Sequence, residues 1–389
     1  MSVIAEIFRK EGGVYRDRFG DRMLPSHRRV MRDLEQCRTP VLGGHLYLCD
    51  DCQRTQSAYH SCRNRHCPTC QGDRAEQWAG AQKQRILPTD YYLITFTLPA
   101  SLRPLARSHQ REIYNLLLRC AAQSIQTIAK DPQYIGAQPG MIGVLHTWTR
   151  DLRYHPHAHF LVTAGGVTAD GLAWRTARSS SFLMPARVLS PIFRAKVRDA
   201  LKAASLYDSV PKKAWKQDWV VHVAHAGTGE QMIEYLGRYL FRPPVSNHSI
   251  EQCEPGKVTF RYRDTKSGLK KRCRVTSEEF IRRFLGHVLP RGFTRVRHYG
   301  CFSPGSAKKL AVARSLLEGL QGTATMLEDS QAPTDFDSTR HGIDPEDPQE
   351  EEAAKPSERL CPFCKKATMR RIAEIPRAPR RRCAQRAPP

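Results

Sequence analysis

The sequence predicts an α+β fold in which a largely antiparallel sheet is flanked by helices and preceded by a small cysteine-rich domain. Two observations predict it. Cysteine and histidine residues are dense from Cys37 to Cys70, and their density falls sharply after that. Between residues 87 and 320, strand-like and helix-like patterns interleave with the short spacings of hairpins, which favours an antiparallel sheet.

The individual elements follow from local residue patterns. The β-rich run at 92–98 ends at Pro99, as a strand does. Thr228 and Gln231 fit a capping box, which places the start of a helix near Gly229, and Pro243 ends that helix. In chain order, we expect a strand at 92–98, a helix at 113–128, strands at 141–149 and 157–163, a helix at 188–206, a strand at 219–224 and a helix at 230–241.

The chain is strongly basic. Its 389 residues include 62 Lys and Arg against 38 Asp and Glu, a formal charge of +24 that favours an anionic partner, most commonly nucleic acid. It contains no run of 18 apolar residues and its first 13 residues are polar, so we expect no membrane partner and no secretory signal. We expect a cytoplasmic protein whose 13 cysteines are metal ligands rather than disulfides.

The charge is unevenly distributed toward the C-terminus. Residues 327–358 carry 11 acidic and 2 basic side chains without apolar periodicity, so we expect an acidic disordered linker over 321–358. Residues 359–389 carry 10 basic side chains and 1 acidic side chain, and they include Cys361-Pro-Phe-Cys364. We therefore expect a basic C-terminal tail with a candidate zinc knuckle.

The spacing of the N-terminal cysteines is typical of zinc ribbons. Two Cys-x2-Cys pairs, Cys49–Cys52 and Cys67–Cys70, can present four thiolates to one Zn²⁺, and a site closed by four protein ligands is structural. Arg63 and Arg65 give the same region a cationic face. A second zinc has four further candidate ligands: Cys37, His45, Cys62 and His66. The alternative is that these two cysteines are buried thiols and the histidines contact phosphate.

A histidine-rich segment predicts a second kind of metal site. On a strand at 157–163, His157 and His159 project from one face, about 6.5–7 Å apart, while the alternating apolar residues face the core. Two imidazoles so placed can bind one divalent cation, and a neighbouring strand can supply a third ligand. His146 is our first choice for that ligand and His155 the second. The alternative is a pair of surface histidines that bind backbone phosphates.

Two tyrosines share a face of the helix expected at 230–241. Tyr235 and Tyr239 are four positions apart, at the border of the apolar stripe. Most such tyrosines are amphipathic boundary residues with hydroxyls in water. With a cation bound on a nearby strand, the tyrosines can act as nucleophiles, because the cation neutralises the charge that develops when a phenol attacks a phosphodiester. The product is a phosphotyrosine of similar energy, and two tyrosines permit two successive transfers.

Several motifs in chain order resemble one known family. They are CRNRHCPTC at 62–70, ITFTLP at 94–99, HTW at 146–148, HPHAH at 155–159 followed by Gly165-Gly166, YLGRY at 235–239, VSN at 245–247, and the segment 284–300. Together they cover residues 25–302, which is more specific than any single motif. The chain resembles the HUH rolling-circle transposases of the insertion-sequence-91 family.

The resemblance implies an HUH-type palm at 87–320, preceded by a zinc-binding DNA-recognition domain at 1–86. It implies a bacterial, nucleoid-associated endonuclease and strand transferase that acts on single-stranded transposon ends through a 5′-phosphotyrosine. One or two Zn²⁺ ions are then structural. Whether the protein forms a homo-oligomer is left open.

The resemblance also implies roles for single residues. His157 and His159 match the pair that binds catalytic Mg²⁺ or Mn²⁺, Tyr235 matches the nucleophile, and Tyr239 matches the second tyrosine of some members. The C-terminal knuckle departs from the family at Lys365-Lys366, where two glycines are expected. Zinc binding by the C-terminal cysteines is therefore left open, and the tail can equally be a basic DNA-binding arm.

A basic and aromatic segment at 282–299 suits single-stranded nucleic acid, because cationic side chains can follow phosphates while rings stack on bases. We expect DNA contacts from the following arginines: Arg63, Arg65, Arg282, Arg283, Arg295 and Arg297. The alternative for 282–299 is an amphipathic helix followed by a strand with a solvated cationic face.

Two other functions fit parts of the sequence. The pattern His155-x-His157-x-His159 also fits a histidine-triad nucleotide hydrolase, in which a histidine attacks the α-phosphate without a metal. The chain length, the cysteines and the charge favour a polymeric substrate instead. A non-catalytic zinc-ribbon DNA-binding protein has the same charge and the same cysteines, so composition does not exclude it.

Overall fold

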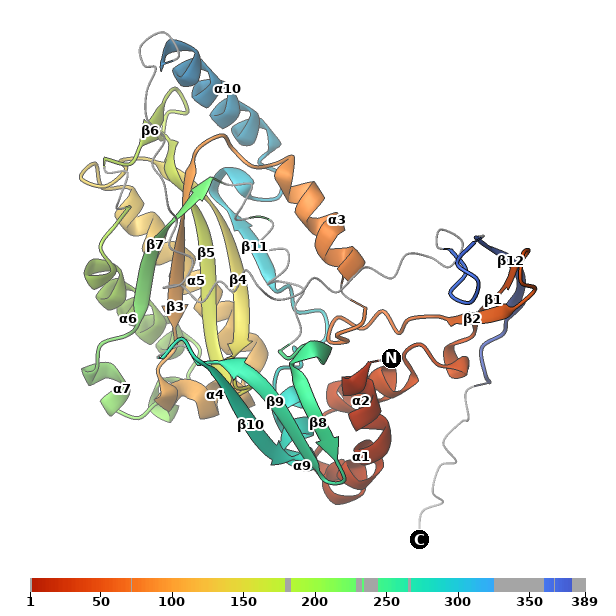
Figure 1. Ribbon diagram of the computed structural model, residues 1–389. Coiled ribbons are helices and arrows are strands. Elements are labelled where there is room, and N and C mark those ends of the chain that lie inside the picture. Colours follow the sequence, from red (N-terminus) through yellow and green to blue (C-terminus); the bar gives the residue numbers. More distant parts are fainter. Residues whose placement is uncertain are drawn as a thin grey trace.

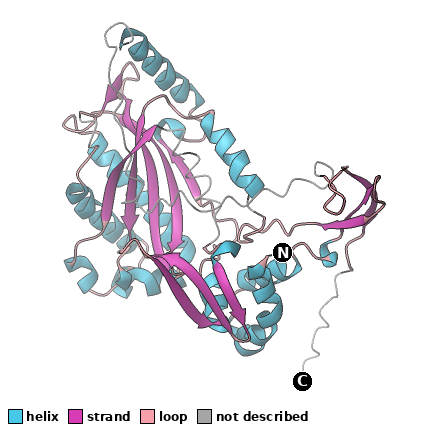
Figure 2. Ribbon diagram, viewed as in Figure 1, coloured by secondary structure: helices cyan, strands magenta, loops and turns pink. Residues whose placement is uncertain are grey.

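The computed structural model describes residues 2–70, 72–178, 183–228, 233, 244–264, 267–324, 360–366 and 368–379. Over these residues the chain forms three antiparallel sheets together with helices that cover them (Figures 1 and 2). The predicted α+β class is thereby confirmed. Within the same ranges, no helix has the length and apolar character needed to cross a membrane.

The largest sheet carries the histidine-rich segment. Its strand order is β11-β4-β5-β3-β7, and the short β6 pairs with β5. Every pairing is antiparallel. The strands are β3 (Asp90–Thr97), β4 (Gln138–Trp148), β5 (Tyr154–Val167), β6 (Trp174–Thr176), β7 (Val221–Thr228) and β11 (Val296–Tyr299). Each predicted strand lies in this sheet, although β5 begins three residues earlier than predicted because Pro156 is accommodated within it.

Helices cover both faces of this sheet (Figure 1). On one face, α5 (Gln110–Ala129) and α6 (Ala186–Ala203) match the helices predicted at 113–128 and 188–206, and they bury a core with alternate residues of β5 such as Phe160. On the other face lie α3 (Gly72–Lys83) and α10 (Ala307–Ala324). The two short helices α4 (Arg103–Ser108) and α7 (Lys213–Lys216) add Leu105 and Ala214 to the same core as α5 and α6. The histidine strand is therefore enclosed between two helical layers.

The N-terminal helices share a core with residues far along the chain. α1 (Val3–Phe19) and α2 (Pro25–Gln36) pack against the second sheet and the helix that follows it. That region comprises β8 (Ile250–Glu254), β9 (Lys257–Arg263), β10 (Lys270–Thr276) and α9 (Ser277–Leu285). The rings of Phe8 and Phe284 meet edge to face, with centroids 5.2 Å apart. The segment predicted as an N-terminal domain is thus joined to the remainder by a continuous apolar core.

The third sheet joins the two ends of the chain. Its order is β12-β1-β2, with β1 (Gly44–Cys49) in the centre, β2 (Thr55–Tyr59) on one side and β12 (Met369–Ile375) on the other. Figure 1 shows β12, in blue, beside the red β1. The sequence did not predict a strand in the basic tail. The linker expected at 321–358 lies outside the described residues from position 325 onward.

Candidate metal sites and their surroundings

Three histidines converge on one point of the large sheet. Ring nitrogens of His146, His157 and His159 all lie within 4.8 Å of one another. His157 and His159 lie on one face of β5, and the β4–β5 register places His146 directly opposite His157. This face is the one covered by α3 and α10, because Leu161 of the same alternation packs in that core. The three side chains can therefore bind one cation together.

Hydrogen bonds orient two of these rings. Nδ1 of His157 donates to the carbonyl oxygen of His155 at 2.7 Å, which directs Nε2 to any metal. Nδ1 of His159 is joined to Oγ1 of Thr95 at 2.9 Å, and the register pairs these two residues across β3 and β5. The sequence did not single out Thr95, since only the strand register brings it beside His159.

His155, our second choice for the third ligand, lies outside the cluster. Its Nδ1 accepts a hydrogen bond from Nη2 of Arg103 at 2.7 Å. The alternation of β5 places it on the same side as His157, with the two ring centroids 5.3 Å apart, but its Nδ1 is bonded to Arg103 of α4.

The surroundings of the histidine cluster keep its three imidazoles uncharged, which is the form that binds a metal cation. Burial holds the pKa of His146 and His159 well below the usual value, and burial lowers the pKa of His157 to about 4. The guanidinium of Arg295 lowers all three pKa values further. At neutral pH the imidazoles are therefore unprotonated, which is the form that binds metals. The donor set fits a divalent cation.

Arg295 lies beside the histidine cluster, where its guanidinium group can also contact a phosphate. Its guanidinium carbon lies 4.8 Å from the ring centroid of Trp148, and its Nε donates to the carbonyl oxygen of Leu145 at 3.0 Å. The ring of Trp148 in turn lies 5.2 Å from that of His146. A fixed positive charge thus stands beside the metal-binding face.

A neighbouring histidine makes the fold sensitive to acid. His287 is 2% exposed, and its Nε2 donates to the carbonyl oxygen of Leu152 at 3.1 Å. Burial lowers its pKa to about 3. In the unfolded chain its pKa is about 6.5, so below that pH only the unfolded state binds the proton, and stability falls as the pH drops from about 6.5 toward 3.

We expect His287→Gln to flatten this acid dependence, by up to about 1.4 kcal/mol per pH unit between pH 6 and pH 4. The glutamine amide can still donate toward Leu152 but does not titrate. The measurement is the free energy of unfolding in denaturant at pH 7, 6, 5 and 4 for both proteins. Parallel curves for the variant and the wild type would contradict this account of His287.

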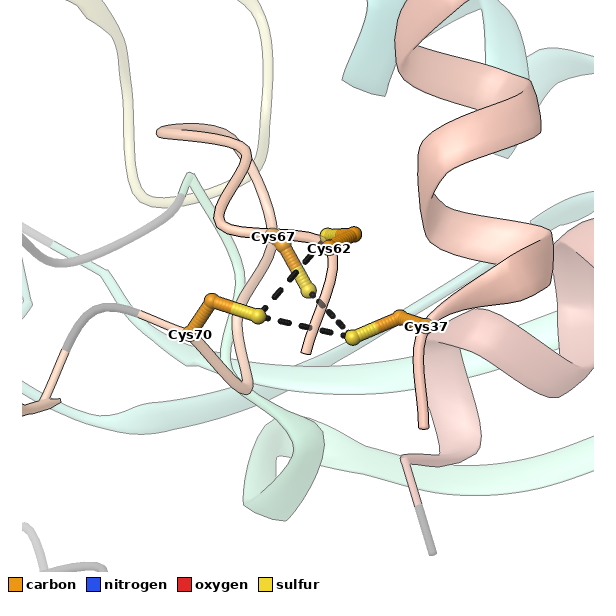
Figure 3. Close-up of side chains that lie close together, drawn as sticks. All are labelled: Cys37, Cys62, Cys67 and Cys70. Carbon is orange, nitrogen blue, oxygen red and sulfur yellow. Dashed lines mark hydrogen bonds between the residues drawn. The ribbon is translucent and has the colours of Figure 1, made fainter. Parts of the chain in front are cut away.

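Four N-terminal cysteines form a second cluster (Figure 3). The Sγ atoms of Cys37, Cys62, Cys67 and Cys70 all lie within 4.8 Å of one another, with contacts of 3.4 Å between Cys37 and Cys70 and 3.7 Å between Cys62 and Cys70. Tetrahedral Zn–S bonds of about 2.3 Å place sulfurs about 3.8 Å apart, so the thiols fit one structural Zn²⁺. Hydrogen bonds from Cys37 and its neighbours hold the pKa of Cys70 below its usual value.

The structure divides the cysteines differently from the predicted pairing. Cys67 and Cys70 lie with Cys37 and Cys62, whereas the predicted partners Cys49 and Cys52 lie in another group with the C-terminal Cys361 and Cys364. The physical reason is that α2 delivers Cys37 to the 62–70 loop, while β1 and β2 carry the other knuckle away to the third sheet.

The two predicted histidine ligands belong to neither cysteine group among the described residues. His66 accepts a hydrogen bond at Nε2 from the backbone N–H of Leu289, at 3.4 Å. The ring of His45 meets the ring of His60 edge to face, with centroids 4.9 Å apart.

The arginines expected to contact DNA have varied surroundings. Arg65 is half-buried and donates to the carbonyl oxygens of Phe293 and Pro290 at 2.7 and 2.9 Å, and burial lowers its pKa. It therefore fastens the 62–70 loop to the segment before β11. Among the others, Arg282 and Arg283 form ion pairs with Glu279, Arg297 donates to Asn115, and Arg63 lines a surface groove. Their contact with DNA stays a prediction.

The predicted tyrosine helix lies outside the described residues, except for Ile233. Ile233 is fully buried in the same apolar cluster as Val144 and Leu161, on the histidine face of the sheet. Tyr235 follows two positions later in the sequence.

Comparisons with known proteins cover most of the chain. A family model described as "Putative transposase" matches residues 140–310, and one described as "Transposase zinc-binding domain" matches residues 7–98. The chain is 37% identical over 387 residues to "Putative transposase y4qJ" of Sinorhizobium fredii, covering 94% of each chain.

A second relative is the transposase for insertion sequence element IS801 of Pseudomonas savastanoi pv. phaseolicola. It is 29% identical over 285 residues, which are 68% of this chain and 67% of the relative. Among solved structures, the conjugative relaxase TrwC in complex with oriT DNA aligns with 59% of this chain and 71% of that one, at 12% identity and a TM-score of 0.23.

Proposed function

The chain belongs to the insertion-sequence-91 family of transposases, and from this premise we propose that it nicks and joins single-stranded transposon ends through a 5′-phosphotyrosine. Three histidines would hold the divalent cation, Mg²⁺ or Mn²⁺, that this reaction uses. The single observation that carries the proposal is the convergence of three neutral imidazoles on one face of the sheet, two of them, His146 and His157, on buried residues.

The roles proposed for the side chains follow from their chemistry. His146, His157 and His159 hold the cation, which supplies positive charge next to the scissile phosphate when bound. Arg295 adds a fixed guanidinium on the same side. The phenolic oxygen of Tyr235 forms a bond to phosphorus as the bond to the 3′ oxygen breaks, so one phosphodiester replaces another.

The proposed reaction balances its protons and its strand ends. The phenol loses its proton as it attacks, and the departing 3′ oxygen gains one. A 3′ hydroxyl of another strand then reverses the step and frees the tyrosine, so no ATP is needed. Tyr239 provides a second acceptor, which permits two strands to be held in turn.

Covalent capture of DNA tests the proposal. Full-length protein is incubated with 5′- or 3′-labelled single-stranded transposon ends and Mn²⁺, then denatured. We expect a denaturation-resistant adduct on the 5′ phosphate side, and none with the double variant Tyr235→Phe/Tyr239→Phe. Tyr262→Phe, on β9, is the matched control and should retain the adduct.

Absence of an adduct across all end sequences would leave a DNA-binding protein without this activity and refute the proposal. Hydrolysis of mononucleotides that persists in the double tyrosine variant would support a histidine-triad hydrolase instead. Mass spectrometry of the tyrosine peptide identifies which residue carries the DNA.

A further inference from the structure

We propose that Cys49, Cys52, Cys361 and Cys364 bind a second Zn²⁺, which fastens the C-terminal segment onto the N-terminal region and completes a cationic groove. The four Sγ atoms lie within 4.8 Å of one another. Cys361 and Cys364 lie outside both ranges matched by the family models, 7–98 and 140–310. The zinc site does not depend on the proposed function.

The sulfur positions match one tetrahedral zinc ion. Sγ of Cys49 lies 3.6 Å from Sγ of Cys364, and Sγ of Cys52 lies 3.6 Å from Sγ of Cys361. Zn–S bonds of about 2.3 Å in a tetrahedron predict about 3.8 Å between sulfurs. Disulfides need about 2.05 Å, so each sulfur is placed for a shared metal rather than for a bond to its neighbour.

The two Cys-x2-Cys pairs have the same local backbone. In each, the residue after the second cysteine has a left-handed conformation, with φ of 54° at Gln53 and 59° at Lys365. In each, that residue donates its N–H to the carbonyl oxygen of the first cysteine, at 3.0 Å from Gln53 to Cys49 and 2.8 Å from Lys365 to Cys361. The C-terminal pair therefore forms a knuckle although lysine stands where glycine is favoured. Two matching knuckles facing each other are the two halves of a zinc ribbon.

Besides the pairing of β12 with β1 and of β1 with β2, the module around the four thiols has only a small apolar core. Its apolar cluster contains only Tyr47, Cys49, Cys361 and Met369 as buried members among the described residues. A core of that size does not offset the conformational entropy of two hairpins, whereas a structural zinc does. The ligands from the two ends are 309 positions apart in the sequence between Cys52 and Cys361. A metal there adds a second link to the β1–β12 pairing between the two ends of the chain.

The neighbouring backbone is built for a close approach of the C-terminal segment. Gly43 has φ of 67°, and a Cβ at this position would lie 2.6 Å from the carbonyl oxygen of Ile375 and 2.9 Å from the amide nitrogen of Arg377. Beyond β12, the N–H of Ala378 donates to the carbonyl oxygen of Val41 at 3.3 Å. The segment after the knuckle thus continues along the N-terminal region.

This docking encloses a groove of about 1150 Å³ on the surface. Arg29 and Arg32 of α2 and Arg63 line it, and Arg377 lies on the C-terminal side. One carboxylate, Asp33, also lines it; it accepts a hydrogen bond from Asn64 at 2.8 Å and forms ion pairs with Arg29 at 3.6 Å and Arg32 at 3.8 Å, so the groove keeps a net positive charge. Four guanidinium groups in one groove suit the phosphate backbone of a nucleic acid. This part of the inference rests on the proposed function.

Zinc content and thiol reactivity of the full-length chain test the metal site. We expect two Zn²⁺ per wild-type chain by native mass spectrometry and one in the double variant Cys361→Ser/Cys364→Ser. Alkylation mapped by peptide should then reach Cys49 and Cys52 in the variant, while Cys67 and Cys70 stay protected and show that the rest is folded. Cys253→Ser, an exposed cysteine outside both groups, should keep two zinc ions.

Unchanged zinc content or unchanged protection of Cys49 in the double variant would overturn the shared site. The groove has its own readout, the dependence of DNA affinity on salt. Arg377→Ala should lower the slope of log K against log salt concentration by about 1. Arg371→Ala, on β12 and outside the groove, is the control. Equal slopes for the two variants would overturn the groove while leaving the zinc site standing.

Discussion

Replacing His157 or His159 with alanine is expected to abolish strand cleavage while leaving most of the affinity for single-stranded DNA. Each histidine provides one of three ring nitrogens that lie within 4.8 Å of one another. Losing a ligand removes several kcal/mol of charge stabilisation, which corresponds to a rate decrease on the order of 10³-fold. Affinity persists because it arises from many dispersed phosphate contacts. Cleavage rates with Mn²⁺ and binding measured in parallel give both quantities.

His155→Gln is the matched control for this experiment. His155 is on the same strand, yet its Nδ1 accepts from Arg103 and it lies outside the cluster. We expect cleavage within about tenfold of the wild type. Normal cleavage by the His157 or His159 variant in the presence of a chelator would contradict the assigned metal site.

Replacing Cys67 with serine is expected to unfold the N-terminal cysteine cluster and abolish recognition of transposon ends. Cys67 is fully buried and packs in the core shared by α1, α2 and α9. Structural zinc contributes about 10–16 kcal/mol in zinc-finger peptides, which is as large as the whole stability of a typical domain. Limited proteolysis should show new cleavage between α2 and α3, and binding of transposon ends should fall to the level of DNA of unrelated sequence.

Two comparisons make the Cys67 experiment specific. The exposed Cys253 replaced by serine should behave as the wild type. If the large sheet stays folded in the variant, cleavage of single-stranded DNA of unrelated sequence should decline less than the binding of transposon ends. A proteolytic pattern identical to the wild type would show that the cluster does not hold this region together.

The meeting of the three histidines could be predicted from sequence because it depends mainly on local periodicity. Alternation along one strand is enough to place His157 and His159 together, and the apolar residues between them give the buried side. His146 was predicted from its position on the preceding strand, and the register pairs it with His157. Local rules of this kind do not need the rest of the fold.

The grouping of the cysteines could not be predicted, because it depends on which distant segments meet. Spacing identifies Cys49–Cys52 and Cys67–Cys70 as knuckles but gives no information on their partners. Those partners are brought by α2 for one knuckle and by β12 for the other. In the same way, a basic residue such as Arg65 is expected to contact DNA. Its actual partners, two backbone carbonyls, lie more than 220 positions away in the sequence and could not be predicted from local rules.

The core that α1 shares with β9 and α9 has a consequence for synthesis of the protein. Phe8 leaves the ribosome early, but its partner Phe284 is made about 70% of the way through translation. Until then the first two helices can pack only against each other, without the β9 and α9 residues that complete their core. A chain interrupted before that point therefore lacks the sheet and helix that complete the core around α1, and we expect its first helices to be only partly packed.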